Sequence, residues 1–361
     1  MGVAYHSPLC HVFPRKRDKR DCPRCHALVD RNARTWYDYC VAVKQQGRLV
    51  TKVSENKIDK LKQAISKSYV GSGGVVEHLI IALLSGGHVL LEDVPGVGKT
   101  TLAKAVAESV AMDFARVQCT PDTLPTDILG TTVFDPKDGS FRMLKGPIFH
   151  RFLLADEINR TSPKTQSALL EAMEEHQVTI DGTSYKLPEP FLVVATQNPV
   201  EQLGTYPLPE AQLDRFMMKV TPGYPGKTEQ MTLAKMFLTG ELRQPIEPVL
   251  TSEELLQCME EVKAVILKDE VIEYALAIVE ATRTEKEVSC GLSPRASLDL
   301  LRASQATAFV RGRDFVIPED VIEIAKVVLP HRLVLTAEAK INHFTGYQVI
   351  LGVLDRTKRP Q

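Results

Sequence analysis

The chain has 361 residues, of which 44% are apolar and 25% are charged, and its formal net charge at pH 7 is −1. Such a length can hold two domains with separate cores, and the composition is typical of a soluble globular protein. The balanced charge gives no general attraction to nucleic acid, and the sequence offers neither an apolar run long enough to span a bilayer nor the apolar core of a signal peptide. We therefore expect a cytoplasmic protein without a membrane span.

Residues 1–50 differ from the rest of the chain. They contain ten Lys or Arg residues against four Asp, and four of the seven cysteines: Cys10, Cys22, Cys25 and Cys40. The run Cys22–Pro23–Arg24–Cys25–His26 fits half of a zinc site, with Cys10, Cys40 or His11 as conceivable further ligands, but a second closely spaced pair is missing. The run also matches c-type haem attachment, which the lack of an export signal disfavours. We prefer a disordered basic arm or an upstream extension, and expect Cys119, Cys258 and Cys290 to be packing thiols.

Helical spacing of apolar residues predicts helices over residues 53–68 and 75–84, the second ended by Gly86–Gly87. An apolar strand, Val89–Leu91, then runs into the turn Pro95–Gly98, which opens a further helix. Glycines let backbone N–H groups approach an anion, and the helix N-terminus adds partial positive charge. Lys99 is therefore placed for the β- and γ-phosphates of a nucleotide, and Thr100 for its Mg²⁺.

The predicted nucleotide-binding loop comprises Asp93, Val94, Pro95, Gly96, Val97, Gly98, Lys99, Thr100 and Thr101. Asp93 stands where the general phosphate-loop pattern has glycine, although Asp tolerates left-handed backbone better than most residues. Taken alone, the stretch could also be a strand-to-helix turn that binds no ligand. Partners found further along the chain make this alternative less attractive.

Polar side chains end two of the buried strands that follow. After a strand at 115–119, the run RFLLADEINR predicts a strand that presents Asp156 and Glu157, and FLVVATQN predicts one that ends in Asn198. Open α/β sheets bind ligands at the carboxyl ends of their strands. We assign Asp156 to an outer-sphere hold on Mg²⁺, Glu157 to polarising the attacking water, and Asn198 to orienting that water.

Two hairpins are predicted around these strands, at Asp138–Gly139 and Asp181–Gly182, and an amphipathic helix at 163–176 lies between them. Farther along, Arg215 lies beside Asp214 at a helix-to-strand junction. Arg215 could form a surface ion pair of little energetic value. The functional interpretation is an arginine finger that reaches the γ-phosphate bound by a neighbouring subunit.

The α/β region is expected to end near Tyr224–Gly226, and Pro245 and Pro248 mark a linker. A capping box at Thr251 and Glu254 opens a helix, and further helices are expected near 269–284, 294–310 and 318–329 without an evident strand. Arg295 falls in the first turn of one of them, where a cation opposes the helix dipole. A nearby phosphate would explain that position better than an exposed arginine.

Five motifs lie along residues 54 to 345 in a fixed order: LLEDVPGVGKT, ADEINRTSPKTQSALLEAMEE, ATQNP, GTYPLPEAQLDRF and GLSPRA. They resemble the motifs of the MoxR-type AAA+ ATPases, in the same order. The resemblance implies an α/β P-loop core with a five-stranded parallel sheet, an all-α lid, and assembly into a hexameric ring. It assigns Walker A to Lys99 and Thr100, and Walker B to Asp156 and Glu157. Asn198 becomes sensor 1, Arg215 the finger, and Arg295 sensor 2, which acts on its own or a neighbour's nucleotide.

The resemblance also divides the chain into an N-terminal extension (1–53), an ATPase core (54–245) and a lid (246–361). It places the hairpins at 131–145 and 177–187 toward the ring pore and implies a partner with a von Willebrand A domain. ATP-driven, chaperone-like remodelling or metal insertion is the leading hypothesis. A chelatase-type motor, an ATP-gated binding module with little turnover, and a nucleic-acid motor that uses the basic arm remain as alternatives.

Overall fold

The computed structural model describes residues 57–92, 96–137, 139–198, 205–240 and 245–360. Internal contacts divide the chain into Met1–Val50 and Thr51–Gln361, and all of the described residues belong to the second unit. The predictions for the cysteine arm (Cys10, His11, Cys22, Cys25, His26 and Cys40) and for Asp93, Val94 and Pro95 lie outside the described residues.

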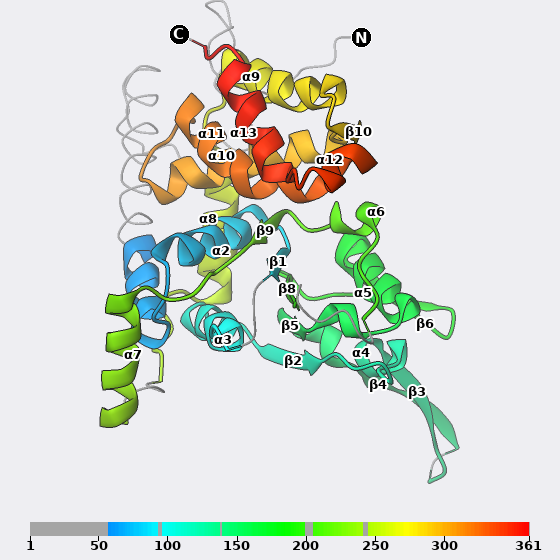
Figure 1. Cartoon of the computed structure of the whole chain (residues 1–361). Helices are drawn as coiled ribbons and strands as arrows, with labels where there is room; N and C mark the ends of the chain where they lie inside the picture. Colours follow the sequence, from blue (N-terminus) through cyan, green and yellow to red (C-terminus); the bar gives the residue numbers. More distant parts are fainter. Residues whose placement is uncertain (1–56, 93–95, 138, 199–204, 241–244, 361) are drawn as a thin grey trace, which may run out of the picture. The chain divides into compact units, whose positions relative to one another are not determined.

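A five-stranded parallel sheet forms the centre of the α/β part, in the order β2-β5-β8-β1-β9 (Figure 1). Its strands are β1 (Val89–Glu92), β2 (Phe114–Gln118), β5 (Phe152–Asp156), β8 (Leu192–Gln197) and β9 (Met218–Val220). All run in one direction, because a helix or a longer connection returns the chain between consecutive strands. The parallel sheet predicted from the family resemblance is therefore confirmed.

Helices cover both faces of this sheet. They are a helix over residues 57–68, α2 (Gly73–Ser85), α3 (Lys99–Ser109), α4 (Pro125–Leu129) and α5 (Pro163–Glu175). Two further helices of the α/β part, α6 (Glu210–Leu213) and α7 (Lys227–Thr239), bury none of their side chains. The sequence analysis predicted no helix between Gly226 and the linker at Pro245, so α7 is an element that it missed. The Gly226 N–H donates to the Glu229 carboxylate at 2.6 Å, an N-terminal cap that the sequence analysis overlooked.

Alternate residues of each strand enter different cores, as the two-residue period of a strand requires. Val89 and Leu91 pack into one cluster with residues of α2 and α3, whereas Leu90 packs into a second with residues of α4 and α5. The first cluster continues without a break into the C-terminal helices, through residues such as Leu255 and Leu300. One apolar core thus joins the sheet to the helical part.

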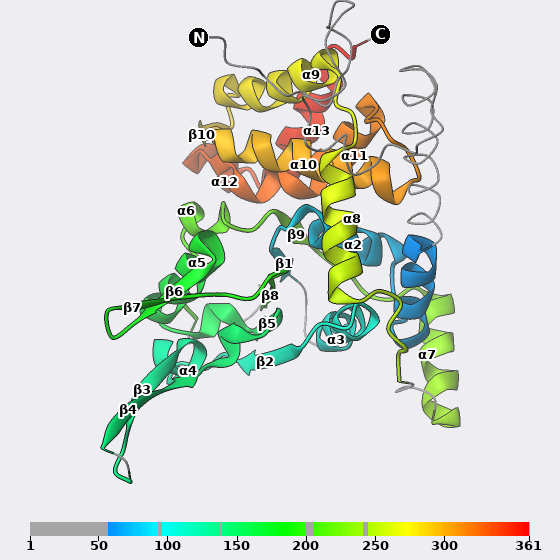
Figure 2. The same ribbon diagram turned by 180° about the vertical axis from the view of Figure 1, so that it is seen from behind.

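Two antiparallel hairpins project from the α/β part, as predicted (Figures 1 and 2). They pair β3 (Gly130–Asp135) with β4 (Ser140–Lys145), and β6 (Gln177–Ile180) with β7 (Thr183–Lys186). Asp181 and Gly182 have φ values of 48° and 79°, which is the backbone that an Asp–Gly hairpin turn requires. Asp138, in the other predicted turn, lies outside the described residues.

The C-terminal part is helical, with α8 (Ser252–Lys263), α9 (Asp269–Ala281), α10 (Pro294–Val310), α11 (Pro318–Val328), α12 (Ala337–Ile341) and α13 (Gly346–Arg356). Thr251 and Glu254 form the predicted capping box at the start of α8. A two-stranded ribbon of β10 (Val288–Cys290) and β11 (Val334–Leu335) adds strands that were not expected. Cys290 in this ribbon is exposed, so the prediction of a packing thiol holds for Cys119 and Cys258 but is wrong for Cys290.

A buried arginine fastens the helical part to the sheet. The guanidinium of Arg332 donates to the carbonyl oxygen of Phe216 at 2.9 Å and to the Asp299 carboxylate at 2.7 Å. Another of its nitrogens lies 3.2 Å from the Asp214 carboxylate, and 1% of the side chain is exposed. Next to it, the ring of His331 hydrogen-bonds the same Phe216 carbonyl at 2.9 Å. Arg332 therefore joins the chain just before β9 to α10.

Two buried histidines make the stability of the protein sensitive to acid. Burial lowers the pKa of His88 to about 4 and that of His331 to about 3, from an ordinary value of 6.5. His88 is held neutral between the Met173 carbonyl at 3.1 Å and the Val193 N–H at 3.0 Å. Between pH 6 and 4 the unfolded chain therefore binds protons that the folded chain excludes.

We expect the free energy of unfolding to be fully retained above pH 6.5 and to fall by roughly 1.4 kcal/mol per histidine for each pH unit below it. Urea unfolding at pH 7 and pH 5 measures this slope. His88→Gln removes one titrating group. The free energy of unfolding of this variant should therefore fall less steeply with decreasing pH, by roughly 1.4 kcal/mol per pH unit. An unchanged slope in that variant would contradict the assignment.

Candidate functional site

The glycine loop after β1 has the backbone that an anion cradle requires. Gly96 and Gly98 have φ values of 89° and 82°, a left-handed conformation that side chains with a Cβ rarely adopt. Gly98 is the residue immediately before α3, and Lys99 and Thr100 form its first turn. The N-terminus of a helix thus follows directly on the glycine turn, as predicted.

Asp156 lies at the carboxyl end of β5 and is 8% exposed. One carboxylate oxygen accepts a hydrogen bond from the Thr196 hydroxyl at 2.6 Å. The other accepts hydrogen bonds from Arg116 Nε at 3.1 Å and Nη2 at 2.7 Å, and from the Thr100 hydroxyl at 3.4 Å. The structure therefore brings together Thr100 and Asp156, the two residues that the sequence analysis assigned to Mg²⁺.

Glu157 follows Asp156 directly and has φ 60° and ψ 50°, an unusual left-handed backbone for a residue with a side chain. Its N–H donates to the Thr196 hydroxyl at 2.8 Å, which holds this bend in place. One oxygen of its carboxylate accepts hydrogen bonds from Gln118 and from Arg160, each at 3.1 Å. Thr196 therefore contacts both acids of the DE pair (Asp156 and Glu157), the first through its side chain and the second through its backbone.

Asn198 follows the last residue of β8 and is 4% exposed. Its carbonyl oxygen accepts a hydrogen bond from the amide of Asn159 at 3.4 Å. Cys119, which follows β2, lies at the same edge, and its N–H donates to the Asp156 carbonyl at 2.8 Å. Burial, together with the nearby Asp156 and Glu157, raises the pKa of the Cys119 thiol to about 12. This thiol is therefore protonated at neutral pH and is not a nucleophile.

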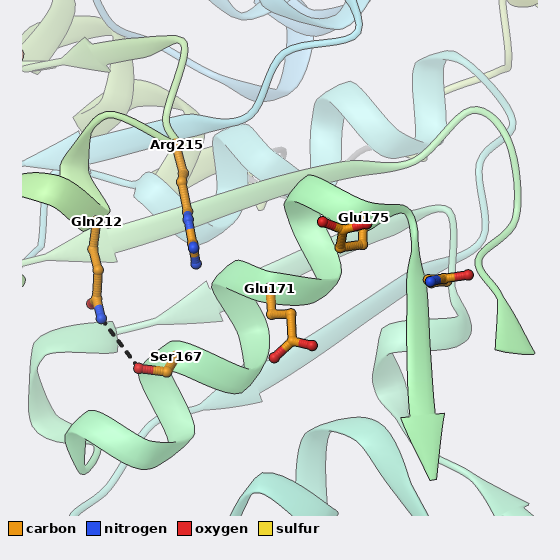
Figure 3. Close-up of a pocket in the computed structure, with 6 residues that line it drawn as sticks. Ser167, Glu171, Glu175, Gln212 and Arg215 are labelled. Carbon is orange, nitrogen blue, oxygen red and sulfur yellow. Dashed lines mark hydrogen bonds between the residues drawn. The ribbon is translucent and has the colours of Figure 1, made fainter. Parts of the chain in front are cut away.

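The two predicted arginines meet at a second place, on α5. Arg215 Nε lies 3.0 Å from one carboxylate oxygen of Glu174, and Arg295 Nη1 lies 2.9 Å from the other. The predicted alternative of an Asp214–Arg215 pair is not the contact found, because Asp214 contacts Ser293 and Arg332 instead. Arg215 extends from its loop toward α5, beside an open pocket of about 560 Å³ (Figure 3). The lining residues are Ser167, Glu171, Glu175, Gln177, Gln212 and Arg215.

Sequence reasoning missed four residues at these two places: Arg116, Gln118, Thr196 and Glu174. Arg116 and Gln118 alternate along β2, so their side chains share one face, and the register pairs Gln118 with Asp156. This alternation of polar residues in ARVQC could have indicated that β2 contributes side chains to the site. The hydroxyl of Thr196 within a buried strand could have indicated the same for β8. Glu174 is one of several acids on α5 and carries no distinguishing pattern.

Comparison with known proteins gives two matches to family models. Residues 88–218 match the ATPase family associated with various cellular activities (AAA). Residues 280–349 match the AAA lid domain. The first range contains the glycine loop, the DE pair and Asn198, and the second contains Arg295.

Relatives that match most of this chain identify the family more closely. Chaperone MoxR1 of Mycobacterium tuberculosis is 43% identical over 306 residues, which is 82% of this chain and 81% of the relative. Protein MoxR of Methylorubrum extorquens is 31% identical over 76% of this chain and 87% of its own. The chain belongs to the MoxR-type AAA+ ATPases.

Two further matches extend over a similar share of the chain. The protein YeaC of Bacillus subtilis, which has no assigned function, is 45% identical over 84% of this chain and 95% of its own length. A crystal structure of an ATPase candidate from Cytophaga hutchinsonii superposes with a TM-score of 0.82 at 38% identity, and covers 89% of this chain and 99% of its own. The fold of this MoxR-type chain, an α/β core followed by a helical lid, is therefore shared with that ATPase candidate.

The residues at the sheet edge fit the nucleotide and Mg²⁺ that the AAA+ family uses. A hydroxyl and a nearly buried carboxylate lie 3.4 Å apart next to a left-handed glycine loop, and hard oxygen ligands of this kind suit Mg²⁺. Within the described residues, no group of three or more His, Cys, Asp or Glu side chains forms another candidate metal site. Among the same residues, no helix is both long and apolar enough to cross a bilayer.

Proposed function

We propose that this protein hydrolyses ATP within a ring of identical subunits and uses the energy to remodel or mature a client protein. The observation that carries the proposal is the convergence of Thr100, Asp156 and Glu157 at the edge of the sheet where the glycine loop opens α3. The relative named Chaperone MoxR1 supports a chaperone-like role. A von Willebrand A partner and a cytoplasmic location belong to the same proposal.

The chain's own residues would divide the chemistry in the following way. Lys99 and the N–H groups at the start of α3 would bind the phosphates, and Thr100 and Asp156 would hold Mg²⁺, which when bound would supply charge that neutralises the phosphates. Glu157 polarises the attacking water, and Asn198 orients it. Thr196 holds the Asp156 carboxylate and the Glu157 backbone, and Gln118 and Arg160 hold the Glu157 carboxylate. Preorganised groups of this kind contribute most to phosphoryl transfer.

Arg215 and Arg295 complete the proposed site as finger and sensor 2. In the structure they lie on Glu174, and their described contacts are with α5 instead of the glycine loop. A finger that acts on a neighbour's nucleotide agrees with this placement. We accordingly assign the ATPase core to residues 54–245 and the lid to 246–361, with 1–53 as an extension.

The test of this function is ATP turnover per subunit across a wide dilution series, with Lys99→Ala as the blank. We expect turnover per subunit to rise with protein concentration, because each site needs Arg215 of its neighbour. Turnover at the level of the blank in a sample that sizing shows to be assembled would contradict hydrolysis. Concentration-independent turnover by a monomer would contradict the shared site.

Mixing two inactive variants tests the finger directly. Arg215→Ala and Glu157→Gln should each be inactive alone, because one lacks the finger and the other the group that polarises water. At equal amounts, about a quarter of the sites combine an intact Glu157 with an intact neighbouring Arg215, so turnover should return to about that fraction. Arg215→Ala mixed with Lys99→Ala should recover to the same extent, whereas Glu157→Gln mixed with Lys99→Ala should stay inactive, because each of its sites lacks Glu157 or Lys99. No recovery at any ratio would remove Arg215 as a finger in trans.

A further inference from the structure

Glu174 is shared by two arginines from different parts of the chain. Arg215 comes from the loop before β9, Arg295 from the first turn of α10 in the lid, and Glu174 from the last turn of α5. The arginines approach opposite oxygens of the one carboxylate, at 3.0 and 2.9 Å. Two guanidinium groups so close repel each other unless an anion lies between them, and Glu174 supplies that anion.

The backbone around this contact is fixed by a parallel set of bonds. Asp214 accepts a hydrogen bond from the Ser293 hydroxyl at 3.1 Å, and Ser293 in turn caps α10 by accepting from the Ala296 N–H. Asp214 precedes Arg215, and Ser293 lies two residues before Arg295. Asp214 therefore helps to hold the backbone near both arginines in place, and Glu174 sets the directions of their side chains.

The contact contributes little to folding, because all three side chains are partly exposed: 28% for Arg215 and 37% for Glu174 and for Arg295. Ion pairs as exposed as this stabilise a fold weakly. The closest approach of Arg215 is through Nε, at the base of its guanidinium. This contact fixes the direction of the Arg215 side chain through Nε. The terminal nitrogens of the guanidinium lie beyond Nε, at the end of the side chain, where they could contact a second anion.

We propose that Glu174 is a positioning residue that orients Arg215 and Arg295 as one unit, so that the finger and the lid arginine engage a nucleotide together. This inference rests on the function proposed above and adds to it a residue that neither the motifs nor the family matches assign. Glu174 itself does not touch the nucleotide. It acts through the two arginines and couples the position of the lid to the finger.

The test compares Glu174→Gln, which removes the charge and keeps the shape, with Glu260→Gln, which removes a carboxylate from an exposed ion pair with Lys263 on α8. We expect Glu174→Gln to lower kcat about tenfold with little change in KM, because misdirected arginines lose orientation that matters in the transition state. Glu174→Asp keeps the charge on a shorter stem and should recover part of the loss. Glu260→Gln should stay within about twofold of the natural protein.

A second readout separates positioning from a merely structural role. In the non-hydrolysing Glu157→Gln background, the preference for ATP over ADP should fall several-fold when Glu174 is also replaced, because the arginines recognise the γ-phosphate. The thermal unfolding midpoint should not change. Unchanged kcat and unchanged ATP preference in Glu174→Gln would overturn the inference, and so would a higher kcat, since the carboxylate would then restrain the arginines instead of directing them.

Arg215→Ala and Arg295→Ala, measured in parallel, distinguish this failure from failure of the proposed function. If both arginine variants keep full turnover, the finger and sensor 2 assignments fail, and the role of Glu174 falls with them. If the arginine variants lose turnover while Glu174→Gln keeps it, the proposed function stands and the positioning role alone is wrong.

Discussion

Replacing Glu157 by Gln should lower ATP turnover by a factor of about 10² to 10⁴ while leaving nucleotide binding intact. Gln has nearly the same shape, and the Glu157 N–H would still donate to Thr196, so the bend after β5 should persist. An amide cannot accept a proton from the attacking water or polarise it as a carboxylate does. Titration with a fluorescent ATP analogue measures binding, and phosphate release measures turnover.

Two control variants show whether the effect of Glu157→Gln is specific. Lys99→Ala should lose binding as well as turnover, because the loop then lacks its contact with the β- and γ-phosphates. Glu108→Gln, at the far end of the same helix α3 in an exposed pair with Lys104, should change neither. Substantial turnover in Glu157→Gln would show that another group polarises the water and that the DE pair has been misassigned.

Replacing Arg332 by Met should lower the free energy of unfolding by about 3 to 5 kcal/mol, because it leaves a buried charge without its partner. Asp299 is 8% exposed and pairs with Arg332 at 2.7 Å, and the Phe216 carbonyl would lose one of its two donors. Met fills much of the same volume, so lost packing contributes little. Urea unfolding at pH 7 measures the change.

Arg356→Met provides the comparison, since Arg356 forms a lid ion pair with Glu285 while its own side chain is 61% exposed. Its loss should change the free energy of unfolding by no more than about 1 kcal/mol. A similar loss in both variants would mean that burial of Arg332 does not set its contribution. Replacing Asp299 by Asn together with Arg332 by Met should recover part of the loss, because the orphaned charge is then removed.

The sequence predicted the parts of the molecule that depend on local pattern. The core strands, the capping box at Thr251 and the turn at Asp181–Gly182 each follow from residues close in the chain, and all are found. The fold class followed from long motifs in a fixed order. The structure places Thr100 next to Asp156, with Glu157 directly after it. The chemical roles of all the site residues, including Lys99, Asn198, Arg215 and Arg295, stay predictions.

What the sequence could not predict depends on distant residues. Glu174 gains its significance from two arginines that lie 41 and 121 positions away, and Arg332 from Asp214 and Asp299. Pairings of this kind leave no periodicity in the chain. The helix α7 was missed for a different reason: within the described residues it buries none of its side chains, so its apolar residues have no inward-facing pattern to detect.

The unbroken apolar core between the sheet and the helical lid limits how this molecule can move. Swinging the lid away as a rigid body would part residues such as Leu79 and Leu300, which share one cluster, and would expose them to water at about 25 cal/mol per Å². Nucleotide-dependent motion is therefore expected in the partly exposed arginine contacts and in the hairpins, with the lid and sheet unfolding as a single cooperative block.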